Sequence, residues 1–345
     1  MDILHLLNVQ SKLVPELYLK FNKRHEILLT IKINQPVGRK TLVNILNMTE
    51  RVLRTECDIL TKLGLIHKSS IGMSVSDKGE EFLLELKQAL GILDFEKEQL
   101  LIKNKFNLKD VVISKGSFTN NETTKIEMVK CLFDKINALL TKDDVVGVNG
   151  GTTMNYVASQ VDEVFGYGKN ITITPIRGGL TVTKQDIQSN NIAIKMATNS
   201  NNKYQILHAP DNITTTILTD LVKEPIVKQA LDTIYRTSII IHSVGNALEM
   251  AKRRKSSEKI KNLLKQKNAK SESFGSYFDE SGKEVYKALT IGMSNEDVKN
   301  VANVFTIVGG VEKAEAVYSY LNSKPKNTTL IIDEEICKEL ILKIK

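Results

Sequence analysis

The sequence predicts an α/β protein made of an N-terminal winged helix-turn-helix and a C-terminal doubly wound parallel-sheet domain. Three observations lead to this fold class. The chain has 345 residues, which is enough for two domains, or at most three, at roughly 100–200 residues each. Positive charge is concentrated in the first fifth of the chain. From about Leu108 the helical periodicity gives way to short β-branched runs that alternate with amphipathic helices.

Composition excludes several classes of protein. Apolar residues make up 41% and charged residues 26% of the chain, which argues against wholesale disorder. No apolar run approaches the ~18 residues of a membrane helix, and the first residues do not resemble a signal peptide, so we expect a cytoplasmic protein without a membrane partner. Cys57, Cys131 and Cys337 are scattered without a CxxC spacing. We therefore expect buried free thiols, with no disulfide framework and no metal site.

The net charge of +8 is unevenly distributed. Residues 20–68 contain ten Lys or Arg and only four acidic residues, so +6 of the +8 falls in this region. A concentrated basic face is typical of a nucleic-acid binder. On charge alone, a solvated basic surface without a partner is an equally good interpretation.

The order of elements in the basic region favours nucleic acid. Apolar spacing predicts helices over residues 13–33, 39–46 and 50–62, then a hairpin over 65–75 and a helix from about Asp77. Thr49 is a good N-cap for the third helix, and Gly64 ends it. We expect five apolar residues on the inward face of that helix, namely Val52, Leu53, Ile59, Leu60 and Leu63.

This order is the layout of a winged helix-turn-helix, whose third helix enters the major groove of DNA. Arg51 and Arg54 lie in its first turns, so we expect them near base edges. The capping Thr49 belongs to the same face, and three basic residues are better placed for phosphates, namely Arg39, Lys40 and Lys68. The alternative is a small helical protein-interaction domain, and the basic residues on the presented helix weigh against it.

The second half of the chain alternates strands with helices. Strands are expected over residues 110–114, 145–148, 171–175, 204–208, 238–242, 305–308 and 328–332. Helices are expected over 123–140, from 152 to about 161, over 186–197, from about 220, from about 312 and at the C-terminus. This alternation implies a parallel, doubly wound sheet, which binds ligands beyond the carboxyl ends of its strands.

Two turns of this domain repeat the motif of a strand, two glycines and a helix. One contains Gly150, Gly151, Thr152 and Thr153, and the other contains Gly309, Gly310 and Lys313. The glycines let a ligand approach the backbone, and a helix N-terminus suits a phosphate. A third turn contains Arg177, Gly178 and Gly179, and its guanidinium suits a phosphate or carboxylate. A single glycine turn of this kind often serves helix packing alone. The two turns together with Arg177 and Lys313 favour an anionic ligand. Neither of the first two turns matches the glycine motif that binds dinucleotides or the one that binds nucleoside triphosphates.

Catalytic residues are hard to find. His208 and His242 sit at strand ends without a nearby carboxylate, so we expect polar residues with satisfied hydrogen bonds. Glu272 is suited to accept hydrogen bonds from sugar hydroxyls, with plain surface charge as the alternative. No hydrolase or metalloprotease motif occurs. The sequence therefore predicts no catalytic residue, no metal and no cofactor.

Several segments together resemble the SorC/DeoR-type sugar-responsive transcriptional regulators, especially the branch that controls central glycolytic genes. These segments are residues 12–17, 35–39, 49–54, 148–153, 175–180, 250–254, 272–275 and 309–316. The resemblance implies a repressor of glycolytic genes, in particular the glyceraldehyde-3-phosphate dehydrogenase operon. It also implies an effector domain with a sugar-phosphate isomerase or deaminase fold that has lost activity, and fructose 1,6-bisphosphate as the effector.

Carried over position by position, the resemblance places effector contacts on Thr152, Thr153, Arg177, Arg253, Glu272 and Lys313, with backbone contacts from the glycine turns. One departure is Val311-Glu312, where the relatives tend to have small hydroxyl residues. The carboxylate of Glu312 would repel a phosphate unless it points away.

These observations lead to one expected organisation and two alternatives. We expect a DNA-binding domain over residues 1–89, a linker helix over 90–106 and a phosphosugar effector domain over 107–345. The expected partners are operator DNA, a phosphosugar and further copies of the chain in a dimer or tetramer. One alternative is an active sugar-phosphate isomerase or deaminase with a basic appendage, and the other is a protein-interaction scaffold that does not bind DNA.

Overall fold

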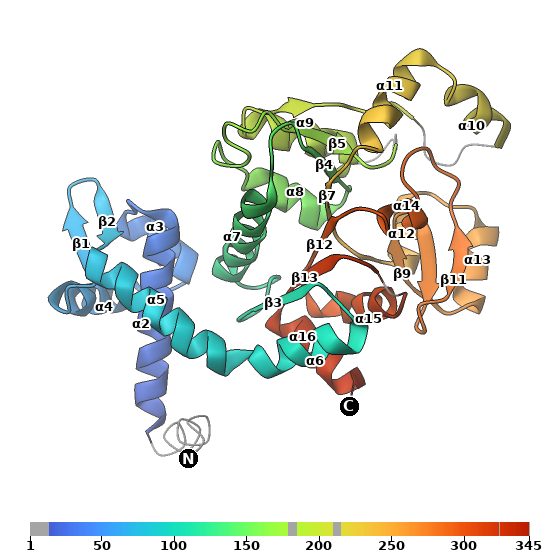
Figure 1. Cartoon of the computed structure of the whole chain (residues 1–345). Helices are drawn as coiled ribbons and strands as arrows, with labels where there is room; N and C mark the ends of the chain where they lie inside the picture. The colour runs from blue at the N-terminus through green and yellow to red at the C-terminus, as the bar shows by residue number, and fades with distance from the viewer. Residues whose placement is uncertain (1–13, 179–184, 210–214, 324, 345) are drawn as a thin grey trace. The chain divides into compact units, whose positions relative to one another are not determined.

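A computed structural model describes residues 14–178, 185–209, 215–323 and 325–344 (Figure 1). Gly179 lies outside these residues. The chain forms two compact units, Met1–Glu96 and Lys97–Lys345, and each is described by itself.

The first unit has the predicted elements in the predicted order. They are α2 (Pro15–Asn34), α3 (Arg39–Leu46), α4 (Glu50–Lys62), β1 (Ile66–Ser69), β2 (Gly72–Val75) and α5 (Asp77–Asp94). The hydroxyl of Thr49 caps α4 by accepting the N–H of Val52. β1 and β2 form the antiparallel wing, and Val37 bridges to Met73 at its edge. The winged helix-turn-helix is thus confirmed.

The inward face of α4 differs from the prediction. Leu53, Cys57 and Leu60 are buried, whereas Val52 is 37% exposed and Leu63 is 47% exposed. The buried residues are spaced four and three apart, which places them on one face of a helix. Val52 falls one residue off that face.

The linker helix expected over residues 90–106 is not one continuous helix. α5 ends at Asp94, Phe95 leaves the helical conformation, and α6 (Glu96–Phe106) begins after it. In the second unit, Ile102 and Phe106 of α6 are buried, and the ring of Phe106 meets Tyr318 edge-on. The apolar side of α6 therefore packs within the second unit.

The second unit contains a seven-stranded parallel sheet with the order β3-β13-β12-β7-β4-β5-β6. Its strands are β3 (Asp110–Ser114), β4 (Val145–Val148), β5 (Thr172–Pro175), β6 (Lys203–Tyr204), β7 (Ile239–His242), β12 (Asn303–Val308) and β13 (Thr328–Asp333). Six of the predicted strands are present at nearly the expected positions, so the parallel sheet is confirmed.

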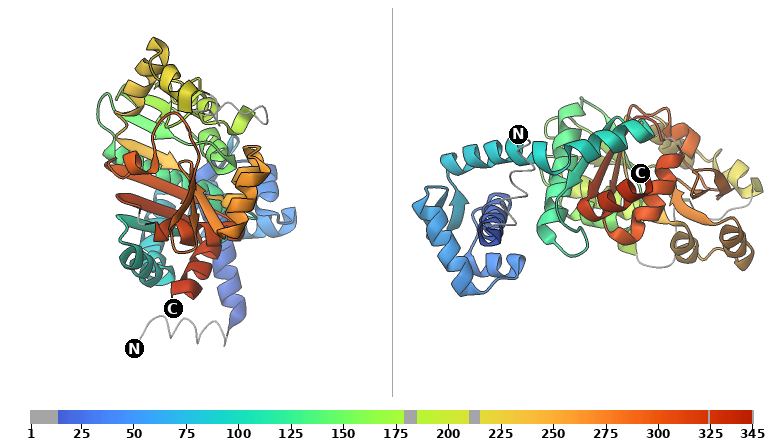
Figure 2. Two further views of the ribbon diagram at one scale, coloured as in Figure 1. Left: turned by 90° about the vertical axis from the view of Figure 1, so that its right-hand side faces the viewer. Right: turned by 90° about the horizontal axis from the view of Figure 1, so that it is seen from below.

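Helices cover both faces of this sheet (Figure 2). On one face the strands pack against α7 (Glu122–Leu139), α8 (Thr152–Ser159) and α9 (Ser189–Asn199), through a core that includes Leu132, Val157 and Ile241. On the other face, Thr306 and His242 meet Tyr320 of α15 (Ala314–Asn322). α16 (Glu334–Ile344) follows β13.

Two elements before β7 differ from the sequence prediction. The strand expected over residues 204–208 stops at Tyr204, because the side chain of Asn190 hydrogen-bonds both the N–H and the carbonyl of Leu207 in place of a neighbouring strand. The helix expected from about residue 220 is two helices, α10 (Thr215–Leu221) and α11 (Pro225–Ile234). Pro225 begins the second one, a position that proline favours.

A second sheet was not predicted. Its antiparallel strands, in the order β11-β10-β9-β8, are β8 (Gly245–Asn246), β9 (Ala269–Ser273), β10 (Ser276–Asp279) and β11 (Glu284–Lys287). α12 (Ala247–Arg253) and α13 (Glu258–Gln266) connect β8 to β9. This sheet brings residues 245–275 to the end of the parallel sheet.

Two expectations from composition can be compared with the structure. Within the described residues, no helix is long and apolar enough to cross a membrane. Cys57 and Cys337 are buried free thiols as predicted, whereas Cys131 is only partly buried.

Candidate functional site

A cavity of about 390 Å³ lies at the carboxyl ends of β4, β5, β7 and β12, where a parallel sheet is expected to bind a ligand. Nine residues predicted from the sequence line it, namely Gly150, Gly151, Thr152, Thr153, Arg177, Gly178, Arg253, Glu272 and Lys313. The tertiary structure therefore brings together residues from five separate parts of the chain.

The first glycine turn forms one wall of the cavity. Gly151 has a φ of +123°, a conformation that other residues rarely adopt. Gly150 lies so close to the carbonyl oxygen of Ile187 that an added Cβ would stand 2.7 Å from it. Gly151 caps α8 without a side chain, so the first N–H groups of α8 receive no side-chain cap at the cavity wall. Such groups suit an anion.

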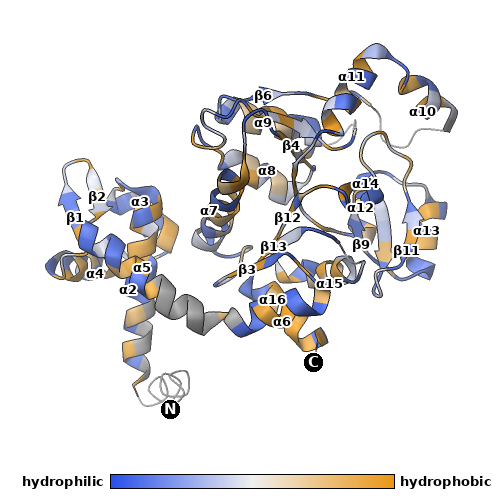
Figure 3. Ribbon diagram, viewed as in Figure 1, coloured by the Kyte–Doolittle hydropathy of each residue, from blue (hydrophilic) through white to orange (hydrophobic). Residues whose placement is uncertain are grey.

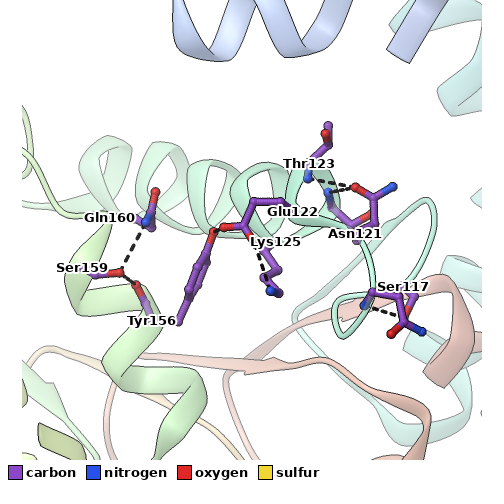
Figure 4. Close-up of polar contacts among 10 residues, drawn as sticks. Ser117, Asn121, Glu122, Thr123, Lys125, Tyr156, Ser159 and Gln160 are labelled. Carbon is purple, nitrogen blue, oxygen red and sulfur yellow. Dashed lines mark hydrogen bonds and ion pairs between the residues drawn. The ribbon is translucent and has the colours of Figure 1, made fainter. Parts of the chain in front are cut away.

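Polar contacts hold α8 against α7 (Figure 4). The hydroxyl of Tyr156 on α8 donates to Glu122 at the start of α7 over 2.7 Å, and Lys125 donates to the same carboxylate over 2.9 Å. The hydrogen bond from Tyr156 joins α8 to α7, whereas the contact between Lys125 and Glu122 lies within α7.

Lys313 reaches the same wall from the turn after β12. Its Nζ donates to Oγ1 of Thr153 over 3.1 Å. Burial lowers the pKa of Lys313 below the ordinary lysine value, and the charge of Arg253 lowers it further, whereas Glu312 raises it. A partly buried ammonium beside a helix N-terminus is a second favourable group for an anion.

Two arginines meet Glu272 at another side of the cavity. Nη2 of Arg254 lies 2.8 Å from Oε1 of Glu272, Nη1 of Arg177 lies 3.6 Å from the same atom, and the N–H of Gly275 donates to it over 2.7 Å. Burial alone raises the pKa of Glu272, but the charges of Arg254 and Arg177 and the N–H of Gly275 lower it by more, so its pKa lies below 4.5. Glu272 is only 5% exposed, which excludes the surface-charge interpretation.

The predicted DNA face of the first unit is exposed throughout. Arg39, Lys40, Thr49, Arg51, Arg54 and Lys68 all have exposed side chains. Arg39 lies 3.7 Å from Glu50, and Lys68 forms an ion pair with Asp58. The hydroxyl of Thr49 is engaged in capping α4. Arg51 and Arg54 form no ion pair with any described residue and lie on the first turns of α4, as a recognition helix requires.

Comparison with known proteins gives both units a counterpart. Residues 21–90 match the "CggR N-terminal DNA binding domain", and residues 92–342 match the "Putative sugar-binding domain". A central glycolytic genes regulator from Priestia megaterium is 34% identical over 97% of this chain and 98% of its own. The protein of the same description from Bacillus subtilis is 33% identical with the same coverage.

The chain belongs to the SorC/DeoR-type family of sugar-binding transcriptional regulators.

Solved structures agree with this assignment. A "putative SorC family transcriptional regulator" from Enterococcus faecalis has a TM-score of 0.66 and 32% identity, and the match covers 71% of this chain and 100% of that one. The full-length sorbitol operon regulator SorC from Klebsiella pneumoniae matches all of both chains with a TM-score of 0.63 at 14% identity, which supports the fold. The relatives are transcriptional regulators, so this chain is a DNA-binding regulator and not an active isomerase or deaminase.

The second glycine turn of this regulator does not line the cavity. The N–H of Gly310 donates to Oδ2 of Asp333 over 2.9 Å, and a Cβ on Gly309 would stand 2.2 Å from Phe118. These glycines therefore serve close packing and a buried hydrogen bond, which corrects the expectation of a second backbone cradle. Glu312 is exposed and is likewise not among the lining residues. Lys313 alone extends from this turn into the cavity.

Neither candidate histidine lines the regulator's cavity. His242 is fully buried, and its Nε2 lies 2.7 Å from Oγ1 of Thr306 and 3.2 Å from the hydroxyl of Tyr320. Burial lowers the pKa of His242 to about 3. His208 is exposed. The expected role of His242 as a hydrogen-bonded core residue fits these contacts.

Sequence reasoning missed several lining residues. They are Asn149, Ile187, Gln188, Ser189, Ser243, Val244, Gly245, Asn246, Glu249, Met250 and Arg254. Arg254 is the most important omission, because it makes the shortest ion pair with Glu272. The only sequence signal was its place beside Arg253, and the choice between the two arginines depends on how α12 ends. Among the described residues, no group of His, Cys, Asp and Glu is arranged to hold a metal ion.

Proposed function

We propose that this chain is a repressor of glycolytic genes, in particular of a glyceraldehyde-3-phosphate dehydrogenase operon, and that a phosphosugar releases it from its operator. The match to two central glycolytic genes regulators along nearly the whole of both chains supports this proposal. The sugar-binding domain supplies the sensor and the winged helix supplies the operator contacts.

The observation that carries the proposal is the charge of the cavity. Within the part of the chain that the structure describes, four cationic side chains line it, from Arg177, Arg253, Arg254 and Lys313. Among the described residues, the carboxylates that line it belong to Glu249 and Glu272, and Glu272 is already paired with arginine. Together with the start of α8, this lining favours an anion that carries several charges.

The two groups of cations favour a sugar with two phosphates, most simply fructose 1,6-bisphosphate. One phosphate would bind the start of α8, Thr153 and Lys313, which the 3.1 Å contact already joins. The other would bind arginine side chains, because the second glycine turn faces Asp333 instead of the cavity. Arg177 and Arg254 around Glu272 are suited to this role, since a guanidinium binds phosphate through two N–H groups.

Release from DNA follows if the effector binds one state of the protein more tightly than another. We infer that the regulator acts as a dimer or tetramer, in which paired recognition helices match two operator half-sites. The bisphosphate would draw together the walls of the cavity and change the interface between copies. The half-site spacing would then be lost.

Thermal unfolding of the full chain with a panel of sugar phosphates tests the effector. A ligand present at 100 times its dissociation constant adds about 2.7 kcal/mol to the free energy of unfolding. We expect the largest shift with fructose 1,6-bisphosphate and smaller shifts with fructose 6-phosphate and glucose 6-phosphate. The shift should be lost in Arg254→Gln and kept in Lys228→Gln, an exposed lysine outside the cavity. No shift with any sugar phosphate would contradict the proposal.

A further inference from the structure

A second basic segment lies in the sensor unit, far along the chain from the winged helix. Residues 252–270 contain nine Lys or Arg and a single acidic residue, Glu258. The net charge of these 19 residues equals the +8 of the whole chain. The charges of all other residues sum to zero, because an acidic excess elsewhere offsets the +6 of residues 20–68.

The structure places this charge at the surface, on two adjacent helices and on the residues that follow each of them. α12 and α13 pack against each other in the second unit (Figure 1). Six of the basic side chains are exposed, namely Lys252, Arg253, Lys255, Lys259, Lys265 and Lys267. We call these six residues, of which Arg253 also lines the cavity, the sensor basic face. Hydrophilic and hydrophobic residues alternate along α13 (Figure 3), and Leu264 is the residue that α13 buries fully.

Local ion pairs compensate little of this charge. Lys261 pairs with Glu258 over 2.7 Å and Lys270 pairs with Glu315 over 2.9 Å, and neither belongs to the exposed six. Among the described residues, no ion pair involves Lys252, Lys255, Lys259, Lys265 or Lys267. The like charges therefore repel one another at the surface, which disfavours the folded unit.

Helix dipoles account for only part of the pattern. Lys252 and Arg253 lie in the last turn of α12, and Lys265 lies in the last turn of α13, where cations are favoured. Lys259 lies in the first turn of α13, and Lys255 precedes that helix by three residues. A cation is disfavoured near a helix N-terminus. Lys255 also follows the end of α12 by two residues, where a cation is favoured, so Lys259 is the residue whose position helix stability does not explain.

We propose that the sensor basic face binds the phosphate backbone of DNA independently of base sequence and adds to the contacts of the winged helix. The charges are spread over two helices and the residues that follow each of them, as a polyanion requires, whereas a small ligand is bound in a cavity. Five of the six residues are lysines, which act as point charges toward single phosphates. The chain belongs to a DNA-binding family, so DNA is a polyanion that this surface meets.

The salt dependence of DNA binding tests this inference. The affinity of the full chain for a duplex without operator sequence is measured by fluorescence anisotropy at several salt concentrations. We compare the wild type with Lys259→Gln/Lys265→Gln/Lys267→Gln, none of which lines the cavity. Each phosphate contact contributes about 0.9 to the slope of log affinity against log salt. The slope of the triple variant should fall by up to about 2.7.

A matched control removes the same charge elsewhere in the same unit. Lys130, Lys142 and Lys228 are exposed and form no ion pair with a described residue. The variant Lys130→Gln/Lys142→Gln/Lys228→Gln should keep the wild-type slope. Equal decreases in both triple variants would show a general effect of net charge and would overturn the proposal, as would unchanged slopes in both.

Two further readouts keep the result interpretable. Glutamine has nearly the helix propensity of lysine, so both variants should melt near the wild-type temperature. If the triple variant does not fold, Lys265→Gln alone should lower the slope by about 0.9. A loss of stabilisation by fructose 1,6-bisphosphate with unchanged DNA binding would mean that the face serves effector capture, and the proposal would be wrong.

Discussion

The carboxylate of Glu272 is a negative charge of the protein itself that lies beside two arginines of the cavity. Its carboxylate lies 2.8 Å from Arg254 and 3.6 Å from Arg177 in a buried setting. A phosphate that binds these guanidinium groups therefore competes with Glu272 for them. Glu272, which the sequence suggests as an acceptor for sugar hydroxyls, thus offsets part of the positive charge of the two arginines.

Glu272→Gln should destabilise the empty protein and increase its response to the effector. Breaking a buried ion pair by removing one partner costs about 3–5 kcal/mol, and a phosphate can replace the lost charge. Thermal unfolding with and without fructose 1,6-bisphosphate measures both effects. Glu258→Gln, at an exposed ion pair, should change neither.

Because the folded pKa of Glu272 is lowered, its stabilisation is present above pH 4.5 and is lost as the pH falls through the lower folded value.

Lys313 should give effector binding a dependence on alkaline pH. Burial lowers its pKa, so Lys313 loses its charge at a lower pH than an exposed lysine. A phosphate is fully ionised above about pH 7.5, given its second pKa near 6. In the wild type, the affinity for fructose 1,6-bisphosphate should therefore fall with rising pH at a lower pH than the ordinary lysine value would give. It should fall less in Lys313→Arg, which keeps its charge. Calorimetric titration from pH 7.5 to pH 10 measures this, and parallel pH profiles would contradict the assigned role.

At the scale of single elements, the start of α8 depends on one backbone conformation. Gly151 has a φ of +123° with open space around its Cα. Gly151→Ala should therefore strain the turn by about 1–3 kcal/mol and displace the N–H groups that face the cavity. We expect a lower melting temperature and a loss of stabilisation by the effector. Gly168 also has a positive φ and open space, and it lies outside the cavity. Gly168→Ala should melt lower but keep its full response to the effector.

The helix α4 should carry operator specificity. Arg51 and Arg54 are exposed on its first turns, so we expect them to contact base edges and expect their replacement by alanine to remove these contacts. Each base contact is worth about 1–3 kcal/mol, and we expect Arg51→Ala/Arg54→Ala to lower operator affinity tenfold or more. Lys62→Ala, in the last turn of α4, should have a small effect. Fluorescence anisotropy with operator and scrambled duplexes measures the ratio of the two affinities. An unchanged ratio in the double variant would exclude α4 as the recognition helix.

At the scale of the whole molecule, the effector and the operator must influence each other equally. If fructose 1,6-bisphosphate lowers operator affinity by a given factor, the operator must lower effector affinity by the same factor. Such factors are typically about 5–150. Titrations of each ligand in the presence and absence of the other give both numbers. Equal effector affinities with and without operator would exclude the proposed release mechanism.

The sequence by itself determined the elements whose formation depends on near neighbours. Helix spacing, the Thr49 cap and the hairpin at Gly72 predicted the winged helix, because each is stabilised within a few residues. The β-branched runs predicted six of the parallel strands, since strands buried on both faces are almost wholly apolar. The first glycine turn was recognisable for the same reason, because its conformation is local.

Only the tertiary structure decided which groups face the cavity. The short, polar strands of the second sheet have no apolar run of their own, and that sheet carries Glu272 to Arg177 and Arg254. The two glycine turns look alike in sequence. The N–H of Gly310 donates to Asp333, 23 residues further on, and the N–H of Gly151 donates to the carbonyl of Ile187, yet of these glycines only Gly150 and Gly151 line the cavity. Contacts between residues that are distant in the chain decide which residues face the cavity. A pattern of neighbouring residues in the sequence does not reveal these contacts.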